Sequence, residues 1–131
     1  MKTVLFVCVH NAGRSQMAEA IFNNLAQGSA KALSAGTMPS ARGLNPRAVA
    51  VMQEMGIDMS NQRPKLMTEE LIKQSDKIVT MGCGVEDACP AGVVIAEDWG
   101  LDDPTGQPIE VVRRIRDEIR EKVQTLLKEL Q

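Results

Sequence analysis

The stretch "VLFVCVHNAGRSQMAEA", residues 4–20, determines the fold class, because its hydrophobic pattern changes period in the middle. Residues 3–7 form a continuous apolar run, which is typical of a strand buried on both faces. From Arg14 onward the apolar residues repeat at helical spacing. They are Met17, Ala18, Ile21, Phe22 and Leu25. The stretch therefore predicts a buried strand, a loop that begins at Cys8, and a helix that ends near Gly28.

The rest of the chain continues this alternation. Strands are predicted at residues 31–36, at 76–82 and within 91–99. Helices are predicted from the N-cap Asn45 to Gly56, from the N-cap Thr68 to Gln74, and over residues 109–130. The residues expected to face inward in the first of these helices are Ala48, Val49, Met52 and Met55. In the last helix they are Ile109, Val112, Ile115, Ile119, Val123, Leu126 and Leu130, and a coiled-coil segment is the competing interpretation.

Strands that alternate with helices predict an α/β fold, with a four-stranded parallel sheet covered by helices on both faces. We expect residues 1–131 to form a single domain, because a chain of this length suits one hydrophobic core. Ligands of such sheets bind at the carboxyl ends of the strands. Cys8 directly follows the first apolar run, so it is predicted to lie at that edge.

Composition excludes several classes of protein. The formal net charge is −2 and only 2% of residues are aromatic, which argues against a nucleic-acid-binding surface. No apolar stretch is long enough for a membrane span, and the N-terminal run is too short for a signal peptide. We therefore expect a cytoplasmic protein with no membrane partner, and a monomer. Three cysteines without a secretion signal argue against a structural disulfide framework.

The loop between the first strand and the first helix is suited to bind an oxyanion. Successive backbone N–H groups can turn inward there, and the helix N-terminus adds partial positive charge. Asn11 and Gly13 tolerate unusual backbone conformations, and the Arg14 guanidinium matches a tetrahedral oxyanion. We call this segment the oxyanion loop; it consists of Val9, His10, Asn11, Ala12, Gly13, Arg14 and Ser15.

Cys8 stands at the floor of the oxyanion loop. The same N–H groups would stabilise its thiolate and lower the pKa of the thiol below about 8.5. The pattern therefore predicts a nucleophile directed at the central atom of a bound oxyanion. The alternative is an inert buried cysteine, with Arg14 solvated on the helix.

Several motifs are similar to those of a known family. The segments "VCVHNAGRSQMAEA", "SAGT" at 34–37 and "DDP" at 102–104 resemble the low-molecular-weight phosphotyrosine phosphatase superfamily. Within it, the thioredoxin-coupled arsenate reductases are the closer match, essentially end to end. The resemblance implies that Cys8 is the nucleophile and Arg14 the oxyanion ligand. It also implies that Ser15 bonds the thiolate and that Asn11 maintains the shape of the loop.

The resemblance also implies a general acid and a redox relay. The acid would be Asp103, which precedes Pro104, although Asp-Pro is also a common turn. Reduction of arsenate requires two electrons, which thiols supply by forming a disulfide. Cys83 would attack Cys8 and release arsenite, and Cys89 would then attack Cys83. The final disulfide would be reduced by thioredoxin, with no metal and no cofactor.

Other functions stay open at this point. A low-molecular-weight protein-tyrosine phosphatase, or one acting on small phosphomonoesters, would use the same Cys-x5-Arg loop. Zinc bound by the cysteines and His10 fits the spacing poorly. A non-catalytic oxyanion sensor would not need the thiol. Glutaredoxin or mycoredoxin with a small thiol would replace thioredoxin if Cys89 were idle.

Two features depart from the pattern of the resembled family. Five residues separate Cys83 from Cys89, where many thioredoxin-coupled members have six. Some members also bind potassium through positions that correspond to Asn11, Glu19 and Ser34 and through an Asp that aligns with Lys65. We therefore predict that no potassium binds here and that Lys65 substitutes for the ion electrostatically.

Overall fold

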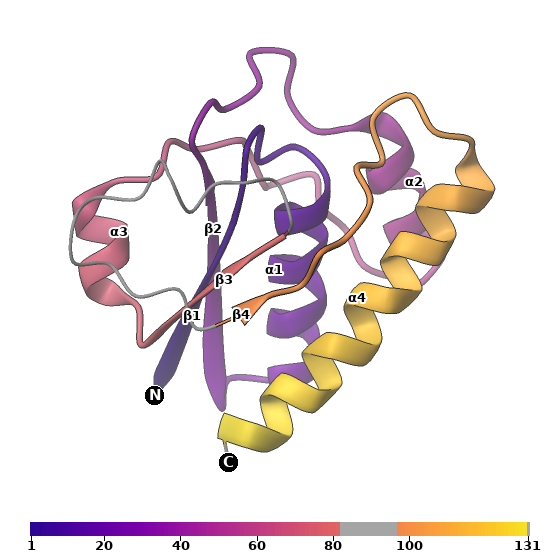
Figure 1. The fold of residues 1–131 in the computed structure, drawn as a ribbon. Helices are drawn as coiled ribbons and strands as arrows, with labels where there is room; N and C mark the ends of the chain where they lie inside the picture. The colour runs from indigo at the N-terminus through magenta and orange to yellow at the C-terminus, as the bar shows by residue number, and fades with distance from the viewer. Residues whose placement is uncertain (82–96, 131) are drawn as a thin grey trace.

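Four parallel strands form a sheet with the order β2–β1–β3–β4 (Figure 1). The structure is a computed structural model, and it describes residues 1–81 and 97–130. The strands are β1 (Lys2–Cys8), β2 (Ala30–Gly36), β3 (Lys77–Thr80) and β4 (Glu97–Asp98). The predicted α/β fold with a four-stranded parallel sheet is confirmed, and β1 lies inside the sheet between β2 and β3.

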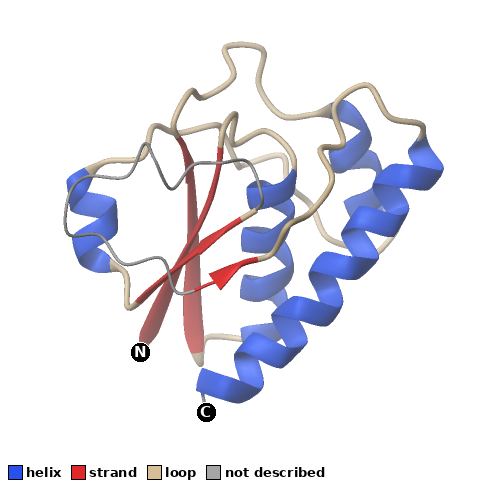
Figure 2. Ribbon diagram, viewed as in Figure 1, coloured by secondary structure: helices blue, strands red, loops and turns tan. Residues whose placement is uncertain are grey.

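Helices cover both faces of the sheet, as predicted. They are α1 (Arg14–Ala26), α2 (Pro46–Gln53), α3 (Glu69–Gln74) and α4 (Ile109–Leu130). Figure 2 shows α3 alone on one side, with the other three helices on the opposite side. Both predicted N-caps are confirmed, since the side chains of Asn45 and Thr68 accept backbone hydrogen bonds from the first turns of α2 and α3.

The two faces of β1 contribute to two separate cores, which explains its continuous apolar run. On the larger side, the Phe6 ring packs against Phe22 of α1 and Trp99, with ring centroids 6.0 and 5.2 Å apart. On the other side, Leu5 and Val7 belong to a smaller cluster that packs against α3. Every side chain of β1 from Val4 onward is therefore buried.

Some predicted burial patterns were wrong. In α2 the buried residues are Ala48, Val51 and Met52, and Met55, just beyond the end of the helix, is partly buried. The apolar face therefore follows the helical spacing i, i+3, i+4 and i+7. Val49 does not belong to that face and is only half-buried. Leu25 is exposed, although the next residue of α1, Ala26, is buried; its side chain borders a small open cavity with Met55 and Ile57.

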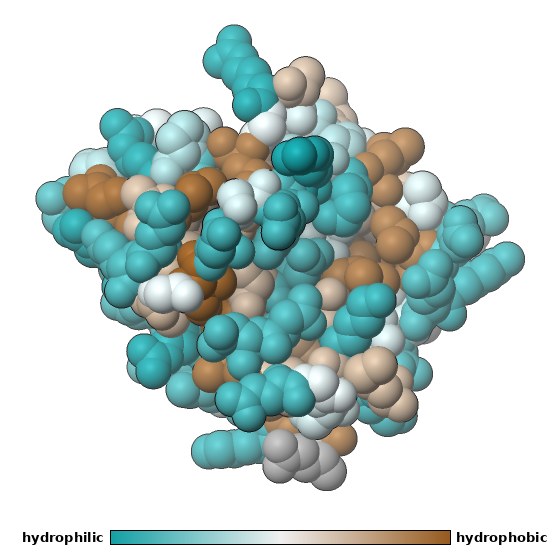
Figure 3. All heavy atoms as spheres, turned by 180° about the vertical axis from the view of Figure 1, so that it is seen from behind, coloured by the Kyte–Doolittle hydropathy of each residue, from teal (hydrophilic) through white to brown (hydrophobic). Residues whose placement is uncertain are grey.

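The rear face of the molecule is mostly hydrophilic. Figure 3, which shows the molecule from behind, has hydrophobic residues in separate small patches among hydrophilic ones. The large hydrophobic side chains that stay exposed in the described part of the chain are Met1, Leu25, Met38 and Leu66. Within the same residues, no helix combines the length and the apolar character that crossing a bilayer requires.

The chain that leaves β2 runs beside the oxyanion loop. Met38 N donates to Val9 O at 2.8 Å and Ser40 N donates to His10 O at 3.0 Å. Gly36 lies at the closest approach, where an added Cβ would be 2.5 Å from Val9 O and 3.0 Å from the Asn11 Cβ. Glycine at position 36 is therefore a steric requirement of the loop.

We predict that Gly36→Ala destabilises the protein by about 2 kcal/mol or more, because the added methyl group meets backbone that cannot move aside cheaply. Urea denaturation measures the change. Gly28→Ala is the matched control: Gly28 has φ +86°, but its added Cβ meets nothing within 4 Å. The free energy of unfolding of that variant should fall by only about 1 kcal/mol, which is the cost of placing alanine in the left-handed conformation. Equal losses in both variants would contradict the steric argument.

Candidate active site

The oxyanion loop joins the carboxyl end of β1 to the N-terminus of α1. Cys8 is the last residue of β1, and Gly13 is the N-cap of α1. The helix N-terminus therefore directs its partial positive charge toward the loop. An added Cβ on Gly13 would lie 2.9 Å from Pro104 Cγ, so the loop packs closely against the segment that carries Asp103.

Polar groups of Ser15 and Asn11 contact the sulfur of Cys8, which is 3% exposed. Ser15 Oγ lies 2.9 Å from Cys8 Sγ, and the backbone N–H of Asn11 donates to the same sulfur at 3.2 Å. A hydrogen bond donated to sulfur stabilises the thiolate relative to the thiol. The contacts therefore favour the nucleophilic form of Cys8.

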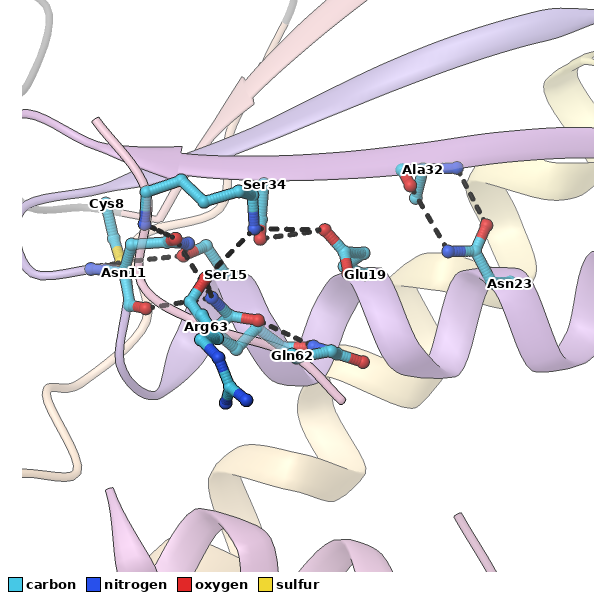
Figure 4. A network of polar contacts seen from close by, with 11 residues as sticks. Cys8, Asn11, Ser15, Glu19, Asn23, Ala32, Ser34, Gln62 and Arg63 are labelled. Atoms are coloured by element: carbon cyan, nitrogen blue, oxygen red, sulfur yellow. Dashed lines mark hydrogen bonds and ion pairs between the residues drawn. The ribbon is translucent and has the colours of Figure 1, made fainter. Parts of the chain in front are cut away.

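Asn11 adopts the left-handed conformation that its residue type tolerates, with φ 50°. Its side chain is fully buried and connects three segments (Figure 4). The Oδ1 atom accepts from the backbone N–H of Lys65 at 2.8 Å and from Gln16 Nε2 at 2.9 Å. The Nδ2 atom donates to Ser15 Oγ at 2.7 Å. The shape of the oxyanion loop thus depends on contacts with the first turn of α1 and with Lys65, which is distant in the sequence.

Arg14 is held in place by backbone carbonyl groups. Its Nη1 donates to Met81 O at 3.3 Å and to Leu101 O at 3.0 Å. Its Nη2 lies 3.8 Å from Asp103 Oδ2. The side chain is 8% exposed, so the solvated alternative for Arg14 is wrong. The guanidinium is positioned beside the carboxylate that the sequence predicts as the acid.

Asp103 lies near the loop with a half-exposed side chain. Burial raises the pKa of this carboxyl group. A hydrogen bond from Thr105 N at 2.9 Å and the charges of Arg14 and His10 outweigh that effect and leave the pKa below its ordinary value of 3.8. Asp103 is therefore ionised at neutral pH when no anion occupies the loop. A bound dianion would raise its pKa, which is what a general acid requires.

The structure says less about three other predicted site residues, namely His10, Cys83 and Cys89. His10 is exposed, and its Nδ1 lies 3.2 Å from Met38 O. Cys83 and Cys89 lie outside the described residues, so their predicted roles stay predictions. In residues 1–81 and 97–130 no three His, Cys, Asp or Glu side chains form a group that could hold a metal.

Lys65 is the residue that the sequence predicts to take the place of a potassium ion. Its Nζ is 3.8 Å from Glu19 Oε1 and donates to Arg63 O at 3.1 Å. Ser34 Oγ donates to Glu19 Oε1 at 2.9 Å. Burial raises the pKa of Glu19 above its ordinary 4.5, and the charge of Lys65 and the bond from Ser34 offset only part of that rise. The predicted absence of potassium stays a prediction.

Sequence reasoning missed Gln16 and Gln62. Gln16 is fully buried, and its Nε2 bonds Asn11 O, Asn11 Oδ1 and Arg63 O. Gln62 Nε2 donates to Gln16 Oε1 at 2.6 Å. Glutamine is usually exposed, so helical periodicity gives no reason to place Gln16 inside. The sequence did show that Gln16 directly follows Ser15 in the first turn of the helix, and this position next to the oxyanion loop could have indicated a supporting role.

An open cavity of about 800 Å³ borders the outer side of the loop. Its lining includes His10, Ala12, Leu44 and Thr105, with the cationic side chains of Arg42 and Arg47. Cys8 does not line this cavity. The reacting oxyanion would therefore occupy the loop itself, while the cavity offers room beside it for the remainder of a larger molecule.

Comparisons with known proteins agree with this geometry. Residues 3–131 match the family model described as low molecular weight phosphotyrosine protein phosphatase. Arsenate reductase 2 of Staphylococcus haemolyticus is 37% identical over 126 residues, which cover 95% of each chain.

Solved structures that are similar to this chain also include arsenate reductases. A structure described as an arsenate reductase in the phosphate binding state is 36% identical, with a TM-score of 0.89 over 100% of both chains. The thioredoxin-dependent arsenate reductase of Corynebacterium glutamicum is 36% identical, with a TM-score of 0.84; the match covers 100% of this chain and 62% of that one.

We predict that Lys65→Met lowers the free energy of unfolding by about 0.5–1 kcal/mol at pH 7 and by less near about pH 4. Above its raised pKa, Glu19 is charged in both states, and Lys65 offsets part of the cost of burying that charge. Below the ordinary value of 4.5, Glu19 is protonated in both states and this offset disappears. Denaturation by urea at the two pH values measures the difference.

Lys73→Met, at an exposed position of α3, is the control for this prediction and should change little at either pH. Potassium chloride should raise the melting temperature of the unmodified protein no more than sodium chloride at the same ionic strength. Two results would contradict the idea that Lys65 takes the place of a potassium ion. One is a loss of unfolding free energy in Lys65→Met that does not depend on pH, and the other is a rise in melting temperature that only potassium produces.

Proposed function

The chain belongs to the low molecular weight phosphotyrosine protein phosphatase family, and we propose that it is an arsenate reductase. The observation that carries this proposal is the buried Cys8 sulfur, which accepts the Asn11 N–H and contacts Ser15 at the floor of an oxyanion loop. The relatives named arsenate reductase span nearly the whole chain, which favours arsenate over other oxyanions.

In the first step the Cys8 thiolate attacks the arsenic atom of bound arsenate. The Arg14 guanidinium and the N-terminus of α1 stabilise the negative charge on the arsenate oxygens. Asp103 gives a proton to the departing oxygen, which leaves as water. The product is a covalent adduct in which sulfur is bonded to arsenic(V).

The second and third cysteines complete the reduction. The Cys83 thiolate attacks Cys8 Sγ, the sulfur–arsenic bond breaks, and arsenic keeps the electron pair and leaves as arsenite. Cys89 then attacks Cys83, which releases Cys8 as a thiolate and leaves a Cys83–Cys89 disulfide. The described chain supports this order, because Met81, whose carbonyl Arg14 holds, precedes Cys83 by only two residues.

Thioredoxin is the proposed reductant of the final disulfide. Support comes from the similar Corynebacterium glutamicum protein, which is described as thioredoxin-dependent. Two electrons pass from the thioredoxin dithiol to the Cys83–Cys89 disulfide, which restores both thiols.

A phosphatase acting on small phosphomonoesters is the second candidate. The family match and the Cys-x5-Arg loop favour it, since phosphate and arsenate share shape and charge. The chain contains no Tyr, and the open cavity beside the loop offers His10 as its only aromatic ring. A phosphotyrosine ring would therefore find little surface to stack on.

We predict that Cys8→Ser, Cys83→Ser and Cys89→Ser each abolish steady-state arsenate reduction in an assay coupled to thioredoxin, thioredoxin reductase and NADPH. Cys83→Ser should spare any phosphatase activity towards a small phosphomonoester, whereas Cys8→Ser should abolish it. Full arsenate turnover in Cys89→Ser would point to another electron donor. Full turnover in Cys83→Ser would contradict the relay.

We also predict that Asp103→Asn lowers kcat for arsenate by about 10²-fold or more, as expected when a general acid is lost. The KM should stay constant or fall, because the variant removes a carboxylate that repels the incoming anion. Steady-state kinetics separate the two parameters. Asp102→Asn is the matched control, since Asp102 is exposed and pairs with Arg114. A raised KM with unchanged kcat would contradict the role of Asp103.

A further inference from the structure

A series of buried and partly buried polar contacts supports the oxyanion loop. Gln62, Gln16, Asn11 and Ser15 contact one another in turn, and the series ends at Cys8 (Figure 4). Each amide in such a series has one donating and one accepting end, so its orientation determines the role left to its neighbour.

The orientation of the Gln16 amide follows from its surroundings. Its Nε2 atom lies 3.0 Å from Asn11 O, 2.9 Å from Asn11 Oδ1 and 2.8 Å from Arg63 O. Carbonyl oxygens only accept hydrogen bonds, so a donor is required at this point. The Oε1 atom of Gln16 then faces Gln62 Nε2, which donates to it at 2.6 Å.

Gln16 in turn determines the orientation of the Asn11 side chain. One nitrogen of Gln16 bonds both the backbone oxygen and the side-chain oxygen of Asn11, so it fixes the side chain relative to its own backbone. The backbone N–H of Lys65 bonds only the side-chain oxygen. With its oxygen held in this way, Asn11 can present only its Nδ2 to Ser15 Oγ, at 2.7 Å.

The Ser15 hydroxyl therefore accepts a hydrogen bond from Asn11, and its own hydrogen is available for Cys8 Sγ at 2.9 Å. If the Asn11 amide were reversed, its oxygen would compete with the sulfur for the Ser15 hydrogen. A donor to sulfur stabilises the thiolate, whereas an acceptor beside the sulfur favours the thiol.

We propose that Gln16 is a positioning residue: it orients the Asn11 amide and thereby makes Ser15 the hydrogen-bond donor to the Cys8 sulfur. The inference deepens the proposed function, since it rests on Cys8 being the nucleophile. Gln16 acts on the sulfur through Asn11 and Ser15. Gln62 supports it by bonding its Oε1.

The test is the thiol titration of Gln16→Met, a substitution that keeps the length of the side chain and removes its donors. In a background with Cys83→Ser and Cys89→Ser, Cys8 is the sole thiol, and its ionisation is followed by the ultraviolet absorbance of the thiolate. The chain has no Tyr, so no tyrosinate absorbance overlaps the titration. The pKa of Cys8 should rise by about one unit, because the Lys65 N–H bond retains part of the orientation.

Asn23→Leu is the matched control on the same helix. The Asn23 amide bonds Ala32 N at 2.8 Å and Ala32 O at 3.2 Å and does not contact the series (Figure 4). This variant should lower the melting temperature and leave the Cys8 pKa unchanged. Gln62→Met should shift the pKa in the same direction as Gln16→Met but by less, and it decides the test alone if Gln16→Met does not fold.

An unchanged Cys8 pKa in the folded glutamine variants would overturn the proposal. So would an equal rise in Asn23→Leu, because the effect would then be one of general stability. The titration uses no arsenate, so it is independent of the proposed reductase activity. If the unmodified protein showed no arsenate turnover, the proposed function would be refuted. If the variants still showed the predicted pKa shifts, the positioning role of Gln16 would be supported all the same.

Discussion

The conformation of Asn11 is the constraint on which the candidate site depends. This buried residue has a positive φ, its backbone N–H bonds the Cys8 sulfur, and its side chain bonds Ser15. Such a conformation persists only when surrounding contacts determine it. Here they come from Gln16 and Lys65, while Gly36 leaves no room for the loop to move towards β2. The fold thus stabilises the loop shape before any anion binds.

The sequence predicted most of the fold because β1 and α1 carry unambiguous periodicity. The run at residues 3–7 and the apolar face that begins at Met17 agree with the structure. In α2, by contrast, residues 48–52 are all alanine, valine or methionine, so Val49 and Val51 were equally plausible core residues. Val51 is selected by its place in the larger core, where α2 packs against α4 and α1, and that information is not local.

For a related reason, some residues of the candidate site could be predicted from the sequence and others could not. The roles predicted for Cys8 and Arg14 follow from residue type and from their positions at a strand end and a helix start, whereas the role of Asp103 was predicted only from the resemblance to a known family. The supporting contacts follow from neither, because Gln16 and Gln62 are separated by 46 residues and meet only in three dimensions. A buried glutamine gives no periodic signal, and its partner on a loop gives none either. Residues that orient the catalytic groups are therefore harder to find than the groups themselves.

Arg14 links the anion site to the two segments that must cooperate with it. Its Nη1 bonds the carbonyl of Met81, where the chain has just left β3, and that of Leu101, two residues before Asp103. A lysine has a single donating centre and could not hold both carbonyls while directing further donors at an oxyanion, whereas the planar guanidinium has five N–H donors. In the proposed reaction, the side chain that binds the anion therefore also contacts the segment that carries Asp103 and the chain that leads to Cys83. Arg14 would thus couple the two proposed chemical steps.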